Sequence, residues 1–408
     1  MIMQDNEKKP ALRFKGFTDP WEQRKVGTLI EDYTEKTVTQ NQYPVLTSSQ
    51  QQGIVLQEDY FADRQVTTDN NVGYYVLPKG YFTYRSRSDT DVFVFNRNNI
   101  VDKGIISYYY PVFAPKSCDS NFLLRRLNHG IKKQLSMAAE GTGQKVLAHA
   151  KFKNMVVDVP SQSEQEKIGT ILEELDTLIT LHQRKYEKLV NIKKSMLNKM
   201  FPPNGASVPE IRFKGFTDPW EQRKLEEYLE VSSQKNFEGI YTKEDVLSVS
   251  GDFGIVNQIE FQGRSFAGAS VANYGVVETG DIVYTKSPLK SNPYGIIKAN
   301  KGKNGIVSTL YAVYKPKQSV NPEFVQIYFE QDARMNNYMH PLVNKGAKND
   351  MKVSAENALK GQIVFPDIKE QRTISEFFRN LETLITLHQR KLEKLQNIKK
   401  SCLEKMFV

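Results

Sequence analysis

The chain has 408 residues, a formal net charge of +9 and 39% hydrophobic residues. At about 150 residues per domain, this length predicts two or three domains. An aromatic content of 11% is typical of a chain that folds rather than one that stays disordered. Two cysteines, Cys118 and Cys402, are too few for a disulfide framework and lack the spacing of a zinc site. The start MIMQDNEKKP lacks the apolar stretch of a signal peptide, and no run approaches the roughly 18 apolar residues that span a bilayer. We therefore expect a protein of a reducing cytoplasm that is neither secreted nor embedded in a membrane.

The positive charge is spread along the chain. When the chain is divided at the repeats described next, no segment carries more than +3. A basic total can indicate a nucleic-acid partner, but only local clusters can show where such a partner would bind. Net charge alone therefore does not identify a binding surface.

Two long segments of the chain occur twice. RFKGFTDPWEQRK stands at 13–25 and again, unchanged, at 212–224, an offset of 199 residues. TLITLHQRKYEKLVNIKKSMLNKMF at 177–201 and TLITLHQRKLEKLQNIKKSCLEKMF at 383–407 agree at 21 of 25 positions, with an offset of 206. Nearly equal offsets indicate two duplicated halves rather than a short-period solenoid. The halves meet at PPNGASVPE, a composition typical of a linker.

Each half begins with a variable domain. The two domains are only loosely alike, although landmarks such as VLTSSQQQGIV at 45–55 and VLSVSGDFGIV at 246–256 recur in order. IVYTKS, GIVSTLYAVYK and GQIVFP have the β-branched and aromatic character of short strands. Helical periodicity is present at 122–135 and 323–339. We expect an α+β fold in this order: a domain at 1–160, a helix at 161–201, a linker at 202–210, a second domain at 211–366 and a second helix at 367–408.

The near-identical segments are predicted to be long helices. Apolar residues follow one another at steps of three and four, Pro160 and Pro366 precede the two segments, and Pro202 ends the first. Such spacing is typical of a coiled-coil seam, and about 35 to 40 residues make a rod of roughly 55 to 60 Å. A single amphipathic helix of this length needs a partner, so we expect the two copies to pack together. The predicted seam includes Leu175, Leu178, His182 and Leu189 in the first copy and Leu381, Leu384, His388 and Leu395 in the second.

Motifs of catalysis are weak or missing. The sequence has no GxxxxGK[ST] phosphate loop and no GxGxxG after a strand. Asp-Pro-Trp at 19–21 and 218–220 faintly resembles the acidic-Pro-Pro-aromatic motif of amino-methyltransferases, but the second proline is missing. The alternative is that Trp21 and Trp220 anchor each domain by apolar burial.

Two further patterns have structural alternatives. Pro366, Asp367, Glu370 and Arg372 partly match a nuclease carboxylate pattern without its final lysine, and acids at a helix start also interact with the helix dipole. His182 and His388 occupy equivalent seam positions, where a polar residue can fix register. The remaining histidines have no Cys or carboxylate at ligand spacing, so no metal site is predicted: His129, His149 and His340.

Local acid-free stretches are the main sign of a nucleic-acid surface. The 41 residues of 282–322 contain no Asp or Glu but hold seven lysines and four tyrosines. The stretches 70–88 and 120–139 are also free of acids and contain arginine and lysine. Basic residues on loops between aromatic strands can hold phosphates while Arg, Lys, Asn and Gln reach base edges. The alternative is an ordinary solvated surface.

The repeated blocks carry a family resemblance. The segments 10–25 and 209–224, the GDIVYTK landmark, the ProxxxGluGln turn at 160–165 and 366–371, and the LxxLIxLHQRKxEKL helix closely resemble the specificity subunit of type I restriction-modification systems. The resemblance covers essentially the whole chain, twice over.

The resemblance implies two α/β target recognition domains separated by two long antiparallel coiled-coil helices, with an internal pseudo-twofold repeat. Each domain would read one half of a split site in double-stranded DNA, and the helices would fix the gap. The subunit itself would have no catalytic activity, no cofactor and no metal. Two modification subunits would use S-adenosylmethionine to methylate adenine N6, and two restriction subunits would use ATP and Mg. The repeated elements would offer the paired modification subunits equivalent surfaces. The host would be bacterial.

Base-reading residues of this family follow no transferable motif, so the candidates rest on charge and loop position. The loops at 141–145 and 345–349 lie at similar distances before Pro160 and Pro366 and are expected to match. Because the two domains differ, we predict an asymmetric bipartite site. The candidates are Arg64, Arg85, Arg87, Gln144 and Lys145 in the first domain, and Arg264, Lys286, Lys290, Lys298, Lys345, Lys348 and Lys352 in the second.

Two other functions stay open at this point. A self-contained DNA methyltransferase would need a cofactor loop, and S-adenosylmethionine would bind to the isolated chain. A coiled-coil scaffold without a DNA role would show no DNA retention in the assembled complex and no dependence on salt.

Overall fold

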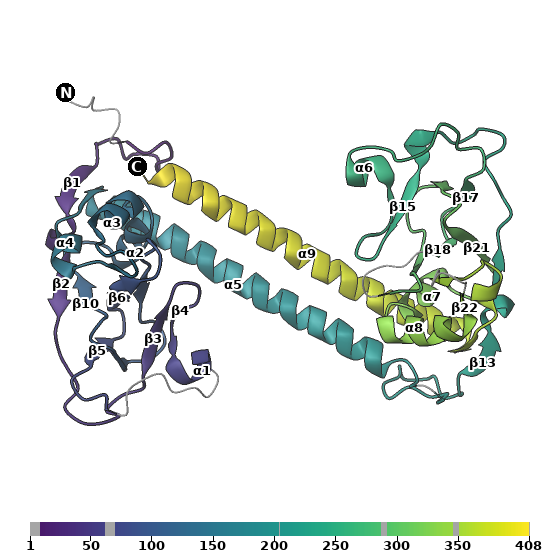
Figure 1. Cartoon of the computed structure of the whole chain (residues 1–408), viewed down its shortest axis with the longest axis horizontal. Helices are drawn as coiled ribbons and strands as arrows, with labels where there is room; N and C mark the ends of the chain where they lie inside the picture. Colours follow the sequence, from purple (N-terminus) through teal and green to yellow (C-terminus); the bar gives the residue numbers. More distant parts are fainter. Residues whose placement is uncertain (1–8, 62–69, 204, 287–291, 346–350, 408) are drawn as a thin grey trace. The chain divides into compact units, whose positions relative to one another are not determined.

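The computed structural model describes residues 9–61, 70–203, 205–286, 292–345 and 351–407. Its contacts divide the chain into unit 1, formed by Met1–Gln183 with Arg390–Val408, and unit 2, formed by Arg184–Gln389. Both boundaries fall inside long helices, α5 (Gln162–Lys199) and α9 (Ile368–Met406). Each unit therefore contains the start of one helix and the end of the other, as the colours of Figure 1 show.

The two predicted long helices are confirmed, and they pair in both units. In unit 1, Asp176 of α5 forms an ion pair with Lys399 of α9. In unit 2, Lys193 of α5 lies 3.0 Å from Glu382 of α9. Asp176 and Lys193 are seventeen positions apart in α5, and Glu382 and Lys399 are seventeen positions apart in α9. The helices are therefore antiparallel and keep one register in both units.

The seam between the helices differs from its prediction at one position in each copy. Leu175 and Leu381 are buried, and His182, Leu189, His388 and Leu395 are half-buried. Leu178 and Leu384, however, are 42% and 45% exposed, whereas the adjacent Ile179 and Ile385 are half-buried. The prediction of Leu178 and Leu384 was wrong because apolar residues stand at both neighbouring positions. The heptad spacing after Leu175 continues through Ile179 to His182.

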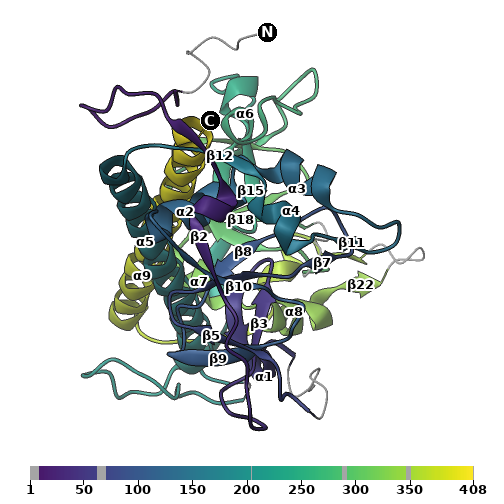
Figure 2. The same cartoon turned by 90° about the vertical axis from the view of Figure 1, so that its left-hand side faces the viewer.

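Unit 1 is built from short antiparallel strands covered by short helices (Figure 2). Its central sheet has the order β2-β10-β6-β8, and β3-β4, β5-β9, β1-β12 and β7-β11 form two-stranded sheets. The elements are β1 (Glu22–Lys25), β2 (Ile30–Tyr33), β3 (Leu46–Ser49), β4 (Gly53–Leu56), α1 (Gln57–Phe61), β5 (Tyr75–Pro78), β6 (Phe82–Tyr84), β7 (Arg87–Ser88), β8 (Phe95–Arg97), β9 (Lys103–Ile106), β10 (Val112–Pro115), α2 (Ser120–Asn128), α3 (Lys132–Ala138), β11 (Lys145–Val146), α4 (His149–Lys153) and β12 (Val156–Val159).

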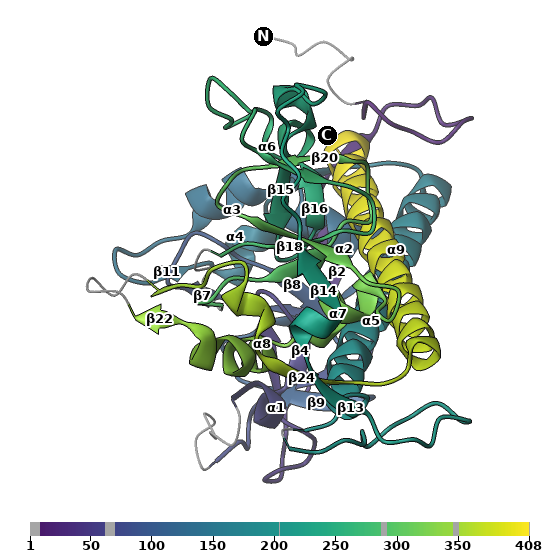
Figure 3. The ribbon, with the colours of Figure 1, turned by 90° about the vertical axis from the view of Figure 1, so that its right-hand side faces the viewer.

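Unit 2 repeats this topology despite its different sequence (Figure 3). Its central sheet is β14-β21-β18-β19, and β15-β16, β17-β20 and β13-β24 match the smaller sheets of unit 1. Both units therefore have the predicted mixed fold. The elements are β13 (Glu221–Lys224), β14 (Leu229–Val231), β15 (Leu247–Ser250), β16 (Gly254–Asn257), α6 (Gln258–Gln262), β17 (Gly275–Val277), β18 (Ile282–Tyr284), β19 (Ile297–Ala299), β20 (Gly305–Val307), β21 (Ala312–Pro316), α7 (Pro322–Tyr328), α8 (Asp332–Met339), β22 (Asn344–Lys345), β23 (Met351–Lys352) and β24 (Gln362–Phe365).

The two helical segments predicted inside the variable domains are each divided into two helices. In unit 1 the break between α2 and α3 contains Gly130, whose φ of +99° is in the left-handed region that favours glycine. In unit 2 the break between α7 and α8 is the connection Phe329–Gln331. Periodicity alone missed these breaks because the apolar spacing resumes after each of them.

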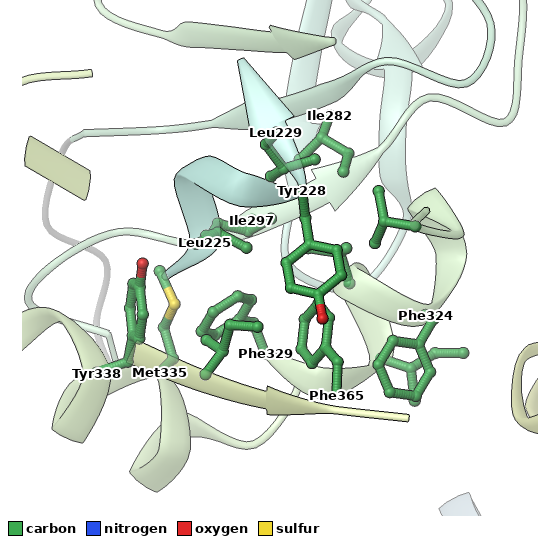
Figure 4. Close-up of a cluster of buried hydrophobic side chains, with 14 of the residues drawn as sticks. Leu225, Tyr228, Leu229, Ile282, Ile297, Phe324, Phe329, Met335, Tyr338 and Phe365 are labelled. Atoms are coloured by element: carbon green, nitrogen blue, oxygen red, sulfur yellow. The ribbon is translucent and has the colours of Figure 1, made fainter. Parts of the chain in front are cut away.

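Each unit has a core that includes the end of a long helix from the other half of the sequence. Met406 and Phe407 join the core of unit 1, and Met200 and Phe201 join that of unit 2. Figure 4 shows part of the unit 2 core, where Phe324, Phe365 and Tyr228 lie close together. Burying apolar surface stabilises the folded state by about 25 cal/mol per Å². Large aromatic side chains therefore contribute strongly to the stability of each unit. Among the described residues, no helix is both long enough and apolar enough to span a membrane.

Candidate nucleic-acid interface

The repeated segments build the same ion pair in both units. Arg13 donates to the Glu164 carboxylate at 2.9 and 2.7 Å, and Arg212 donates to Glu370 at 2.8 and 2.7 Å. Both glutamate side chains are only 1% exposed. Hydrogen bonding to the glutamate raises the pKa of each arginine. These paired residues attach each repeated N-terminal block to the start of its long helix.

The glutamine of each ProxxxGluGln turn makes a second shared contact. Gln165 donates from Nε2 to the Pro160 carbonyl at 2.8 Å, and its Oε1 accepts from the Asp119 amide at 3.0 Å. Gln371 makes the same bonds to Pro366, at 2.9 Å, and to the Asn321 amide, at 2.9 Å. Asp119 and Asn321 cap α2 and α7. The motif therefore fixes a helix of the variable domain against the long helix.

The tryptophans of the repeat are buried anchors. Trp21 is 2% exposed and contacts the rings of Phe122 and Phe407, and Trp220 is 3% exposed and contacts Phe201 and Phe324. The anchoring interpretation is thus confirmed. The nuclease-like pattern also has its structural explanation, because Asp367 caps α9 by accepting from the Lys369 and Glu370 amides at 2.7 and 3.2 Å, and Glu370 is held by Arg212.

A groove of about 760 Å³ in unit 1 collects three of the predicted DNA-binding residues. Arg85, Arg87 and Gln144 line it, together with the β3-β4 hairpin and the loop that precedes β10. Its lining is rich in tyrosine, and among the described lining residues Asp89 is the one carboxylate. The tyrosines are Tyr60, Tyr74, Tyr108, Tyr109 and Tyr110. An open groove with arginine, amides and aromatic faces has the chemistry of nucleic-acid recognition.

Contacts around the groove hold its polar groups in place. The Arg87 guanidinium lies over the Tyr109 ring, 4.0 Å from the ring centre. Gln144 donates to Asp89 at 3.1 Å, and Asn96 donates to the Ser48 hydroxyl at 2.8 Å and to the Ser49 carbonyl at 2.9 Å. Lys145 lies on β11, opposite Ser88 of β7. The segment before it is closed by two backbone hydrogen bonds between Glu140 and Val146.

The corresponding position of unit 2 has different chemistry. Lys286 follows β18 with a φ of +49°, and its ammonium donates to the Thr309 carbonyl at 3.0 Å. Burial, and then repulsion from Lys235, lowers the pKa of Lys286. Arg264 follows α6, exposed, with its guanidinium 4.5 Å from the centre of the Phe266 ring. Phe253, Phe266 and Leu310 are more than half exposed in this unit. At this position unit 2 therefore has a lysine that donates to a main-chain carbonyl, whereas unit 1 has an arginine over a tyrosine ring.

The remaining candidates fall into three groups. Lys298 lies on β19 and is 7% exposed, and burial lowers its pKa more than the nearby Glu330 raises it. Its interior position makes Lys298 unsuited to contact DNA. Lys345 and Lys352 lie on β22 and β23, which pair in the antiparallel direction. Arg64, Lys290 and Lys348 lie outside the described residues.

Sequence reasoning missed the tyrosine side of the unit 1 groove. Tyr108, Tyr109 and Tyr110 stand on the loop before β10 and line the groove beside Arg85 and Arg87. The run of three tyrosines was visible as a signal, but nothing local placed it beside residues that lie more than twenty positions earlier. Within the described part of the chain, no three His, Cys, Asp or Glu residues gather as metal ligands would.

Comparison with known proteins agrees with this architecture. Residues 19–191 match the family model of the type I restriction modification DNA specificity domain. The chain is 23% identical over 297 residues to a putative type I restriction enzyme MjaX specificity subunit of Methanocaldococcus jannaschii, covering 68% of this chain and 65% of that protein. It is 22% identical over 278 residues to the MjaVIII specificity subunit of the same organism, covering 65% and 64%. The aligned regions thus span just under two thirds of these curated relatives.

A solved structure repeats the fold along the chain. The crystal structure of a type I restriction-modification S subunit from M. genitalium has a TM-score of 0.57 and 12% identity, and the match covers 98% of this chain and 99% of that one. Two mixed domains with a pair of long helices, built twice from one plan, define a specificity-subunit fold. Residues 19–191 therefore match a type I restriction modification DNA specificity domain, and the fold along the chain is similar to that of a type I specificity subunit.

Proposed function

We propose that this chain recognises DNA for a type I restriction-modification system, with unit 1 and unit 2 each reading one half of an asymmetric bipartite site. The observation that carries the proposal is the contrast within the repeat. The arginine–glutamate pair and the glutamine that join each domain to the helices are the same in both units, whereas the residues at the groove position differ. Two domains with the same scaffold but different exposed groove residues are expected to recognise two different DNA sequences.

We assign catalysis to partner subunits. Two modification subunits would bind S-adenosylmethionine and methylate adenine N6, and two restriction subunits would use ATP and Mg. The repeated helix surfaces supply equivalent docking sites for paired partners. The complex would act in the bacterial cytoplasm on double-stranded DNA. If the isolated chain bound S-adenosylmethionine by calorimetry, the assignment of methylation to partners would be overturned.

The direct test compares cells that carry the complete system with cells lacking only this gene. Single-molecule sequencing that detects N6-methyladenine is expected to find one bipartite motif in the first and to lose it in the second. Restoring the gene should restore the same motif. If the motif persists without the gene, or if no adenine methylation depends on it, the proposal fails.

The antiparallel helices also allow a test of spacing. Removing 183–189 from α5 together with 386–392 from α9 deletes facing heptads and leaves both interhelical ion pairs, Asp176–Lys399 and Lys193–Glu382, in place. Seven residues of helix measure about 10 Å, which equals roughly three base pairs. We expect a gap about three base pairs shorter with unchanged half-sites. A changed half-site, or an unchanged gap, would contradict a spacing role for the helices.

A further inference from the structure

Arg87 lines the unit 1 groove and is exposed, yet its backbone and its guanidinium are both held by contacts. It belongs to β7, whose pairing with β11 fixes the backbone at Arg87 opposite Val146. The neighbouring Ser86 donates from its amide and its hydroxyl to the Tyr109 carbonyl, at 3.2 and 2.6 Å. These bonds tie the strand that carries Arg87 to the loop that carries Tyr109.

The Tyr109 ring is itself supported by its neighbour. The centres of the Tyr108 and Tyr109 rings are 4.2 Å apart, and the Tyr108 hydroxyl donates to that of Tyr109 at 3.0 Å. The Arg87 guanidinium lies against this pair, 4.0 Å from the Tyr109 ring centre. A guanidinium held over an aromatic ring is restrained by the cation–π contact, while its N–H groups remain available as donors.

Within the described part of the chain, Arg87 has no ion-pair partner. Among the described residues that line the groove, the only carboxylate is that of Asp89, which accepts a hydrogen bond from Gln144. The guanidinium is a donor without acceptor capacity. In the major groove only guanine presents two acceptors, O6 and N7, side by side on one base.

We propose that Arg87, held on Tyr109, reads a guanine in the half-site of unit 1. The inference rests on the proposed DNA-recognition function and deepens it by naming a specificity-determining residue and its base. The guanidinium fork also fits a phosphate, and the two contacts have different consequences: loss of a base contact changes one position of the motif, whereas loss of a phosphate contact weakens binding at all sequences.

The experiment maps N6-methyladenine in cells that carry the complete system with wild type, Arg87→Gln, Arg87→Lys or Tyr109→Leu. Lys79→Gln serves as the matched control, because Lys79 is an exposed cation of the same unit outside the groove lining. Arg87→Gln is expected to lower the preference for guanine at one position of one half-site by roughly 5- to 150-fold. Arg87→Lys and Tyr109→Leu should relax the same position, the other half-site should stay unchanged, and Lys79→Gln should leave the whole motif unchanged.

Several outcomes would overturn the inference. If Arg87→Gln weakens methylation evenly at all sites without changing the motif, Arg87 contacts a phosphate. If the affected position is not a guanine, or if Arg87→Lys keeps the full preference for guanine, the proposal that the Arg87 guanidinium recognises guanine is wrong. A wild-type system without a bipartite adenine-methylation motif would instead refute the proposed function, so the two failures are distinguishable.

Discussion

Unit 1 and unit 2 share a four-stranded central sheet and three matching two-stranded sheets, but they agree closely in only some of their residues. The shared contacts are the Arg13–Glu164 and Arg212–Glu370 pairs, the paired Gln165 and Gln371 bonds, and the tryptophan clusters. All of them join a variable domain to the long helices. The groove position differs, with an arginine over a tyrosine ring in unit 1 and a lysine that donates to a main-chain carbonyl in unit 2.

This difference teaches which residues maintain the architecture and which are free to change. The glutamate and glutamine side chains of these shared contacts are buried and hydrogen-bonded, so most substitutions there leave an unsatisfied partner. Groove residues project from hairpin ends and loops, where side chains can be exchanged without disturbing the sheet. The predictions below test whether the two halves are as alike in their scaffold as these contacts indicate.

The largest expected effect is the loss of a buried carboxylate. Glu164→Ala and Glu370→Ala each leave an arginine that is only 12% or 13% exposed without its partner. Each change should lower the free energy of unfolding by about 3 kcal/mol, and by similar amounts, as measured by urea denaturation. Asp102→Ala, which removes an exposed partner of Lys79, should cost below about 1 kcal/mol. Clearly unequal losses of unfolding free energy for Glu164→Ala and Glu370→Ala would show that the two ion pairs are not equivalent.

A smaller effect is expected where α5 approaches α2. A Cβ at Gly169 would lie 2.3 Å from the Asp119 carboxylate and 3.0 Å from the Phe122 amide, whereas α9 has Ser375 at this position, 3.0 Å from Asn321 Oδ1. Gly169→Ser should therefore lower the free energy of unfolding by about 1 to 3 kcal/mol.

The second change that tests this site is Asp119→Asn. In unit 2 the Ser375 hydroxyl donates to Asn321 Oδ1, so the double variant carries the unit 2 residues at both positions and should recover part of the loss in the same urea denaturation. If the double variant is no more stable than Gly169→Ser alone, the two sites are not equivalent.

The smallest effect concerns pH. Burial, followed by repulsion from Lys132, Lys399 and Arg125, lowers the pKa of His129 in unit 1. The unfolded chain then binds the proton more readily than the native state, so stability is lost as pH falls through the unfolded value of about 6.5. His129→Gln should reduce the loss of unfolding free energy between about pH 7.5 and pH 5. The α7–α8 connection of unit 2, Phe329–Gln331, has no histidine. If His129→Gln left the pH dependence of the unfolding free energy unchanged, His129 would not be the cause of the loss at low pH.

Much of the architecture was predictable because it is written in exact or near-exact repeats. The long helices and the burial of Trp21 and Trp220 followed from periodicity and composition. The sequence does not show whether Leu178 or Ile179 lies in the seam, because both are apolar and only three-dimensional packing distinguishes them.

The site was harder to predict because its geometry is not local. Lys298 stands in an acid-free stretch but is buried on β19, and sequence gives no sign of what covers a strand. Arg87 was identified by its charge, whereas its partner Tyr109 is brought to it only by the bonds between Ser86 and the loop before β10.

The most direct measurement of the central claim is a map of N6-methyladenine across the genome of a cell carrying the complete system. If units 1 and 2 share a scaffold but present different reading surfaces, the map will contain one motif with two unlike half-sites separated by a fixed gap. A contiguous palindrome, or two identical inverted half-sites, would contradict the account.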